Sequence, residues 1–167
     1  YARMAPGKSD LRASGTVIHH LNLAHGSAVA AFRGIKGIGR IGPCLQLAPC
    51  YPADDSPESE AAALAADTTE NTLYLDPLLK GGYPDLSRTN RRVAAGIEAA
   101  TREGDLDAIA APVGFLGVNY YTPVVVDGQG RPVQPHPISA AGWQQVYPQG
   151  LYDVLMRLRR DYASPEV

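Results

Sequence analysis

The sequence predicts a single-domain α/β fold in which short parallel strands lie between helices. Segments with apolar residues at helical spacing alternate along the chain with short runs of apolar, β-branched and aromatic residues. Strands separated by helices favour parallel pairing through right-handed crossovers. The chain has 167 residues, 45% of them hydrophobic and 19% charged, which is enough for one modest domain with a hydrophobic core.

The first helix is expected within residues 9–34. Ser9 and Asp10 are candidate N-caps, and Gly34 is a candidate C-terminal stop. The packed side of this helix is predicted from apolar residues that recur at helical spacing: Ile18, Leu21, Ala24, Ala28, Val29 and Phe32.

A short strand is expected within residues 40–49, where Pro49 ends the apolar run. Cys44 and Cys50 lie about 20 Å apart if this segment is extended, whereas a disulfide needs Cα atoms within roughly 7 Å. Both cysteines are therefore expected to be buried, small apolar residues and not a disulfide or a zinc site.

The next helix is expected to begin at Ser56 as N-cap, with Pro57 in its first turn. At roughly 100° per residue, one face of this helix collects a set of mostly apolar residues, and Glu70 points away from that face. These residues are Ala61, Leu64, Ala65, Thr68, Asn71 and Leu75. Glu70 is therefore expected to be exposed, without the burial or close charge that tunes a catalytic carboxyl group.

Three further elements are expected towards the C-terminus. Residues 87–105 predict a helix, residues 114–122 a strand, and the turn at Asp127 and Gly128 a small hairpin. The last helix is expected within residues 150–162, with four residues on one face: Leu151, Leu155, Leu158 and Tyr162.

Charge and motifs exclude several classes of partner. The formal net charge is −2 with acids and bases interspersed, so neither a nucleic-acid partner nor a membrane is expected. The histidines, at positions 19, 20, 25 and 136, contain no pair at the i, i+4 spacing of a helical metal site. Residues 34–42 are glycine-rich but precede a strand, so no phosphate loop is expected. The sequence predicts no metal and no cofactor.

Alternation along residues 115–121 separates two sets of side chains. Phe115, Gly117, Asn119 and Tyr121 fall on one side, and Leu116, Val118 and Tyr120 on the other, where helices are expected to pack. In parallel α/β folds ligands bind at the C-terminal ends of strands, where the amide and the phenol of the first set lie. The alternative is that these two polar side chains cap loop backbone.

Five segments, in order along the chain, together resemble family 1 glycoside hydrolases, the β-glucosidase-like (β/α)8 barrels. They are HHLNLAHGSAVAAFR, IGPCLQLAPCYPADDSPE, NTLYLDPLLKGGYP, FLGVNYYTP and GWQQVYPQGLYDVLMRLRRDY. The resemblance implies a partial (β/α)8 TIM barrel, about strands 5 and 6 with helices 4 to 6. Residues 1–167 would then be the central segment of a single glycosidase domain, incomplete at both ends.

The resemblance also implies a retaining hydrolase of terminal β-linked glucosyl residues. The family uses a glutamate after strand four as acid/base and one after strand seven as nucleophile, and neither motif is present here. Glu70, in TEN followed by Thr72, does not match the nucleophile motif. No catalytic residue is therefore expected in this chain, and the isolated fragment is predicted to be inactive.

Three residues correspond by position to substrate-pocket groups of the family. Tyr121 corresponds to the tyrosine that hydrogen-bonds the nucleophile, and Asn119 to the asparagine near the acid/base. Gln46 stands where many members carry an asparagine facing the leaving group. Gly114 and Gln149 depart from the family pattern, each replacing a common acidic residue outside the catalytic motifs.

Competing hypotheses are a non-catalytic barrel remnant, a split-barrel piece that acts only with complementary segments, and a sugar-binding barrel that has lost its acids. The expected partners are a β-glucoside or oligosaccharide substrate and complementary barrel segments. Because no signal-peptide pattern is present at the N-terminus, a cytoplasmic protein is expected.

Overall fold

The computed structural model describes residues 7, 9–35, 39–162 and 166–167. The helices are α1 (Leu11–Arg33), α2 (Pro57–Asp67), α3 (Leu73–Lys80), α4 (Arg91–Ala100), α5 (Asp105–Ile109) and α6 (Gln149–Asp161). A π-helical turn η1 (Thr68–Thr72) joins α2 to α3, and a 3-10 turn η2 (Leu86–Arg88) precedes α4. The strands are β1 (Cys44–Gln46), β2 (Cys50–Pro52), β3 (Gly117–Asn119), β4 (Val124–Val126) and β5 (Pro132–Val133).

The predicted parallel pairing is confirmed. β1 pairs with β3 and β2 with β4, both in parallel, and β4 forms the predicted antiparallel hairpin with β5. The two parallel ladders follow one another along the same two segments of chain and are separated by a mismatch in segment length. Between Gln46↔Asn119 and Cys50↔Val124, residues 47–49 lie opposite the longer segment 120–123. One strand therefore carries an extra residue, as in a β-bulge.

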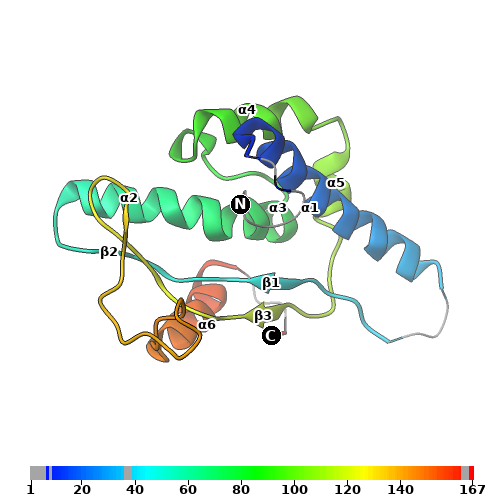
Figure 1. Ribbon diagram of the computed structural model, residues 1–167. Coiled ribbons are helices and arrows are strands. Elements are labelled where there is room, and N and C mark those ends of the chain that lie inside the picture. The colour runs from blue at the N-terminus through cyan, green and yellow to red at the C-terminus, as the bar shows by residue number, and fades with distance from the viewer. Residues whose placement is uncertain (1–6, 8, 36–38, 163–165) are drawn as a thin grey trace.

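Two hydrophobic clusters meet at α3, which lies between the strands and the pair α1 and α4 (Figure 1). The first cluster joins β1, β3, α3 and α6; its buried members are Leu47, Leu75, Leu116, Val154, Leu158 and Tyr162. The second joins α1, α3 and α4; its buried members are Ile18, Leu73, Val93 and Ile97. Both α3 and α6 therefore cover one and the same face of the β1–β3 ladder.

α1 begins and ends as predicted but buries a different face. Asp10 caps it by accepting from the backbone of Arg12 and Ala13, and Gly34 ends it. Leu21 is exposed, and so are Ala24 and Ala28, which corrects the expected packed side. The residues buried instead are Gly15, Ile18, His19, Asn22, Gly26 and Val29.

Backbone approach explains the difference in α1. A Cβ on Gly15 would lie 2.0 Å from the carbonyl oxygen of Val93, and one on Gly26 would lie 2.2 Å from that of Ala108. Only glycine permits such contact, so α4 and α5 pack on the glycine side and not on the side richest in aliphatic residues. In α6, likewise, Gly150, Val154 and Leu158 are buried while Leu151 and Leu155 are exposed.

His19 is a structural histidine of the α1 layer. It is fully buried; its Nε2 lies 3.0 Å from Asp105 Oδ2 and its Nδ1 2.9 Å from the Tyr83 hydroxyl. Because a carboxylate only accepts, His19 donates from Nε2 to Asp105, and its Nδ1 shares the second hydrogen bond with the Tyr83 hydroxyl. This chain of bonds ties α1 to the start of α5 and to the segment after α3.

Glu70 is half-buried, so the prediction of an exposed side chain is wrong. The helix from Ser56 onwards contains the π turn Thr68–Thr72, whose one extra residue per turn rotates everything after Asp67 relative to an α-helix. Glu70 lies within this turn, close enough to Cys50 to raise the pKa of that thiol, and burial raises the pKa of its own carboxyl group.

The cysteines are also corrected in part. Both are free, as expected, but Cys44 is exposed on β1 and Cys50 is only half-buried. Cys44 is exposed because the face of the ladder that carries it is not covered by any helix in the described part of the chain.

The far edge of β3 carries a further backbone contact. Leu116 N donates to the carbonyl oxygen of Glu166 at 2.8 Å, so residues near the C-terminus lie alongside β3 (Figure 1). The described strands form an open arc and not a closed barrel. None of the helices in the described ranges combines the length and apolarity needed to cross a bilayer.

Candidate functional site

The uncovered face of the β1–β3 ladder carries the polar residues singled out in the sequence. Gln46 and Asn119 are register partners at the C-terminal ends of the two strands, so the ladder places their side chains next to each other. Both are exposed, and Tyr121, two residues beyond Asn119, is 44% exposed. The structure thus brings Gln46 and Asn119 together and places Tyr121 just beyond them.

The opposite face explains why these side chains point away from the helices. Leu45, Leu47, Leu116 and Val118 pack into the cluster formed with α3 and α6. Because side chains alternate along a strand, burying this set turns Cys44, Gln46, Gly117 and Asn119 to the other side. A Cβ on Gly117 would lie 3.0 Å from the Cys44 sulfur, a tight contact that glycine avoids.

Trp143 is a residue that the sequence analysis missed. Its ring is 53% exposed and lies against Tyr121, with ring centroids 6.0 Å apart. A lone tryptophan in a loop gives no periodic signal, so only the fold could place it. Tyr121 and Trp143 together present two accessible aromatic rings beside the amide pair, a surface suited to an amphipathic ligand such as a sugar.

The loop that carries Trp143 is held by other aromatic residues. Tyr147 stacks on His136 with ring centroids 4.1 Å apart and meets Tyr51 edge-on at 5.8 Å. Tyr120, on the packed face, donates from its hydroxyl to the Tyr147 carbonyl at 2.6 Å. Burial raises the pKa of Tyr120, so this phenol stays a donor at neutral pH. The loop after the hairpin is therefore fastened to β2 and to the end of β3.

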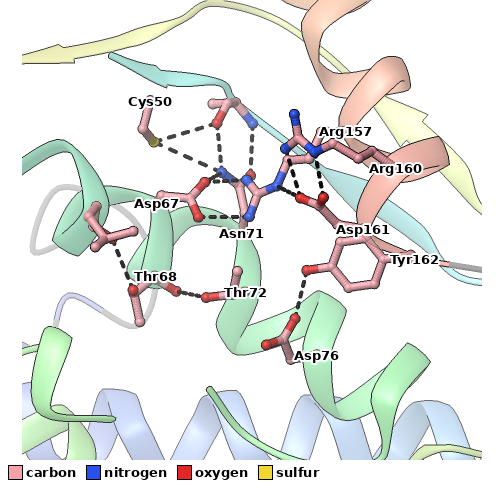
Figure 2. A network of polar contacts seen from close by, with 12 residues as sticks. Cys50, Asp67, Thr68, Asn71, Thr72, Asp76, Arg157, Arg160, Asp161 and Tyr162 are labelled. Atoms are coloured by element: carbon pink, nitrogen blue, oxygen red, sulfur yellow. Dashed lines mark hydrogen bonds and ion pairs between the residues drawn. The ribbon is translucent and has the colours of Figure 1, made fainter. Parts of the chain in front are cut away.

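A polar network lies behind the end of β1, between η1 and α6 (Figure 2). The Asn71 side chain accepts from Ala48 N at 3.0 Å and donates to Ala48 O at 2.7 Å. It also donates to Asp67 Oδ1 at 2.7 Å, and Asp67 in turn forms a two-bond ion pair with Arg157. The sequence analysis placed Asn71 on a packed helix face but gave it no partner.

A small cavity beside this network is the wrong size for a sugar. Its volume is about 30 Å³, enough for about two water molecules. Asn71, Arg157, Asp153 and Leu47 are among its lining residues. It lies on the packed side of the strands, opposite the open face.

Neither a carboxylate pair nor a metal cluster occupies the open face in the described residues. Retaining glycoside hydrolysis needs two carboxyl groups about 5–5.5 Å apart. Glu70 has a raised pKa, but it lies in η1 on the helical side, close enough to Cys50 to raise the pKa of that thiol as well. No group of three or more histidine, cysteine or acidic side chains among the described residues could hold a metal ion.

Comparison with known proteins gives consistent relatives. The profile described as "Glycosyl hydrolase family 1" matches residues 1–167. The chain is 37% identical to beta-glucosidase A of Acetivibrio thermocellus, covering 98% of this chain and 38% of that protein. It is 31% identical to the 6-phospho-beta-glucosidase GmuD of Bacillus subtilis, again covering 38% of that protein.

Solved structures agree with these relatives. The psychrophilic beta-glucosidase BglU from Micrococcus antarcticus superposes with a TM-score of 0.88 at 32% identity, covering 99% of this chain and 40% of that one. Virulence factor SghA from Agrobacterium tumefaciens, in complex with its substrate analog salicin, superposes with a TM-score of 0.80 at 30% identity. The chain thus spans about two fifths of the length of the proteins it matches.

Proposed function

Because the chain belongs to glycosyl hydrolase family 1, we propose that it forms the region of strands 5 and 6, with helices 4 to 6, of a (β/α)8 barrel. That barrel hydrolyses terminal β-linked glucosyl residues with retention of configuration. In this assignment β1 with β2 is strand 5, β3 with β4 is strand 6, and residues 1–167 are the central segment of one glycosidase domain.

One observation supports the proposal most strongly. Gln46 and Asn119 are register partners at the C-terminal ends of parallel strands, on the face that no helix among residues 9–35 and 39–162 covers. In (β/α)8 barrels that end of the strands builds the active site. The exposed ring of Tyr121 adds a hydroxyl and an aromatic surface at the same place.

Each of the three residues has a role in this proposal. Tyr121 donates a hydrogen bond to the nucleophilic carboxylate, which favours its ionised form. Asn119 contacts the sugar near the acid/base, and Gln46 faces the leaving group. The acid/base and the nucleophile come from outside residues 1–167, and no metal or organic cofactor takes part.

A chimera tests the proposal directly. This chain replaces the matching region of beta-glucosidase A from Acetivibrio thermocellus, with which it aligns over 175 residues. We expect the chimera to hydrolyse an aryl β-glucoside and the isolated chain to be inactive. Tyr121→Phe in the chimera should lower kcat by about tenfold or more, because a donor to the reacting carboxylate is lost.

Two results would overturn the proposal. A folded chimera without activity, shown to bind no glucoside, would remove the assignment of Gln46, Asn119 and Tyr121 to a sugar site. Turnover by the isolated chain at a rate comparable to the chimera would show that its chemistry does not depend on residues outside it.

A second candidate is a split-barrel piece that acts only after association with complementary segments. It is favoured by the apolar residues that α6 exposes: Leu151, Tyr152, Leu155 and Met156. Mixing the isolated chain with the two flanking segments of the Acetivibrio thermocellus enzyme distinguishes the two. Activity that appears on mixing supports a split barrel, and activity found only in the covalent chimera supports a continuous one.

A further inference from the structure

Asn71 is almost completely buried and bonds both backbone groups of one residue. Its Oδ1 accepts from Ala48 N at 3.0 Å, and its Nδ2 donates to Ala48 O at 2.7 Å (Figure 2). A single amide side chain thus satisfies both the donor and the acceptor of Ala48, a buried residue. This pairing is the one that an adjacent strand would give.

Ala48 needs such a substitute because its backbone faces away from β3 and β4. Leu47 N donates to Asn119 O and Pro49 O accepts from Val124 N, so both neighbours of Ala48 bond to the paired strand. Consecutive residues of a strand turn their backbone groups to opposite edges. Asn71 therefore lies on the side of this segment that does not pair with β3 and β4. There, just after β1 ends, it bonds the backbone as a neighbouring strand would.

The segment held in this way is the one where the ladder is mismatched. Residues 47–49 lie opposite the longer segment 120–123, so pairing with β3 and β4 alone leaves their course underdetermined. Asn71 fixes it from the other side. Gln46 immediately precedes this segment, and the direction of its side chain depends on how the chain leaves β1.

Asn71 is itself fixed in one orientation. Its Nδ2 also donates to Asp67 Oδ1 at 2.7 Å, and a carboxylate only accepts, which determines which end of the amide faces Ala48. Asp67 is held by Arg157 of α6, with Nη2 at 2.7 Å from Oδ2, and Arg157 also lies 3.7 Å from Asp161. The network therefore connects α6 and η1 to the end of β1.

We propose that Asn71 is a positioning residue for the substrate-facing amide of Gln46, acting through the backbone of Ala48. The inference rests on the proposed function for the identity of the ligand, a β-glucoside, but the mechanical part can be tested without any catalysis. Loss of Asn71 should free residues 47–49 and allow the Gln46 side chain to take several directions.

Cys50 offers a local reporter. Its sulfur lies 3.5 Å from Ala48 O and 3.9 Å from Asn71 Nδ2, and burial raises the pKa of its thiol. With the exposed Cys44 replaced by alanine, alkylation of the single remaining thiol measures how often residues 47–50 open. In Asn71→Leu we expect alkylation about tenfold faster, because the local opening equilibrium loses the bonds that oppose it.

The matched control is Thr72→Val. Thr72 is the next residue in η1, and its hydroxyl bonds only the Thr68 carbonyl, at 3.4 Å, within the same turn. Its alkylation rate should stay within about twofold of the parent. Asp67→Asn, which keeps an acceptor for Asn71 but weakens the pair with Arg157, should fall between the two.

Nuclear magnetic resonance of the isolated chain reports directly on the conformation of the Gln46 side chain. The side-chain amide signals of Gln46, assigned with Gln46→Ala, should form one sharp pair in the parent and broaden or multiply in Asn71→Leu. Amide exchange should accelerate at Leu47 and Ala48 but not at Ile97 in the other hydrophobic cluster. Unchanged Gln46 signals, or acceleration that extends equally to Ile97, would overturn the proposal.

Kinetics in the chimera separate this inference from the proposed function. If Asn71 acts through Gln46, then Asn71→Leu should raise KM for an aryl glucoside more than it lowers kcat, and adding it to Gln46→Ala should change little further. Additive losses would overturn the inference while leaving the hydrolase assignment intact. A chimera that binds no glucoside removes the assignment, and the thiol and resonance measurements still decide whether Asn71 holds residues 47–49.

Discussion

The two faces of the β1–β3 ladder differ although their residues alternate along the same short strands. Leu47 and Leu116 are 2% and 0% exposed and pack against α3 and α6. Gln46, adjacent to Leu47, and Asn119, three positions after Leu116, are exposed side by side. One face packs against helices, and the other is left uncovered by the helices of the described residues.

This contrast shows how a chain of this size can hold a site without burying it. The strands are only three residues long, so their own pairing contributes little rigidity. Their position is set from the packed face. The leucines pack there, Tyr120 bonds the loop, and Asn71 bonds the backbone of Ala48. The packed face supplies the structure, and the open face is free for ligand chemistry.

The largest effect is expected on the packed face. Leu116→Ala should lower the free energy of unfolding by about 3 kcal/mol, because it removes a fully buried side chain from the cluster and leaves a cavity. Urea denaturation followed by circular dichroism measures this. A loss below about 1 kcal/mol would mean that the two faces differ less than their burial indicates.

The contact between α1 and α4, behind the packed face, should be nearly as sensitive to substitution. A Cβ on Gly96 would lie 2.0 Å from the Arg12 carbonyl oxygen, where α4 crosses α1. Gly96→Ala should therefore destabilise by about 1–3 kcal/mol despite the better helix propensity of alanine. Gly82, whose Cβ would meet nothing within 4 Å, provides the control, and Gly82→Ala should be close to neutral.

Glu70 is half-buried, and its substitution should have a smaller, pH-dependent effect on stability. Burial raises the pKa of its carboxyl group, so the folded state favours the neutral form. The stability that this provides is present below the ordinary pKa of 4.5 and is lost as the pH rises through the higher value in the folded state.

Glu70→Gln, which stays neutral, should match the parent in acid and become the more stable protein at neutral pH, by at most about 1 kcal/mol. Thermal unfolding at a series of pH values measures the difference. A difference in stability that is independent of pH would contradict the conclusion that burial raises the pKa of Glu70.

The smallest effect on stability is expected on the open face. Asn119→Ala should change the free energy of unfolding by no more than about 0.5 kcal/mol, because its side chain is exposed. The same denaturation assay used for Leu116→Ala gives a direct comparison of neighbouring faces. A cost of 2 kcal/mol or more would show that the amide has a structural role and that the open face is not free.

Local signals in the sequence predicted most elements correctly. The caps Asp10 and Ser56, the stop at Gly34 and the hairpin at Asp127 each follow from the chemistry of one or two residues. The alternation over residues 115–121 also predicted which side of β3 the helices cover. These features depend on neighbours in the chain, so one sequence suffices to read them.

The wrong predictions concern residues whose burial is determined by segments distant in the sequence. Leu21 was expected to pack, but the close approach of α4 and α5 to glycines of α1 selects another face. Cys44 was expected to be buried, but its side of the ladder has no cover. The bond between Asn71 and Ala48 joins residues 23 positions apart and has no local signal. The roles of Gln46, Asn119 and Tyr121 came from resemblance and stay predictions.

The π turn at Thr68–Thr72 limits how this region can change. If this stretch kept its length but took α-helical geometry, Leu73, Leu75 and Leu78 would swing by up to roughly 100° about the helix axis. Both hydrophobic clusters meet at that helix, so the swing would uncouple them together. The π turn therefore sets the rotation of α3 relative to α2, and its geometry is what lets α3 contact both clusters at once.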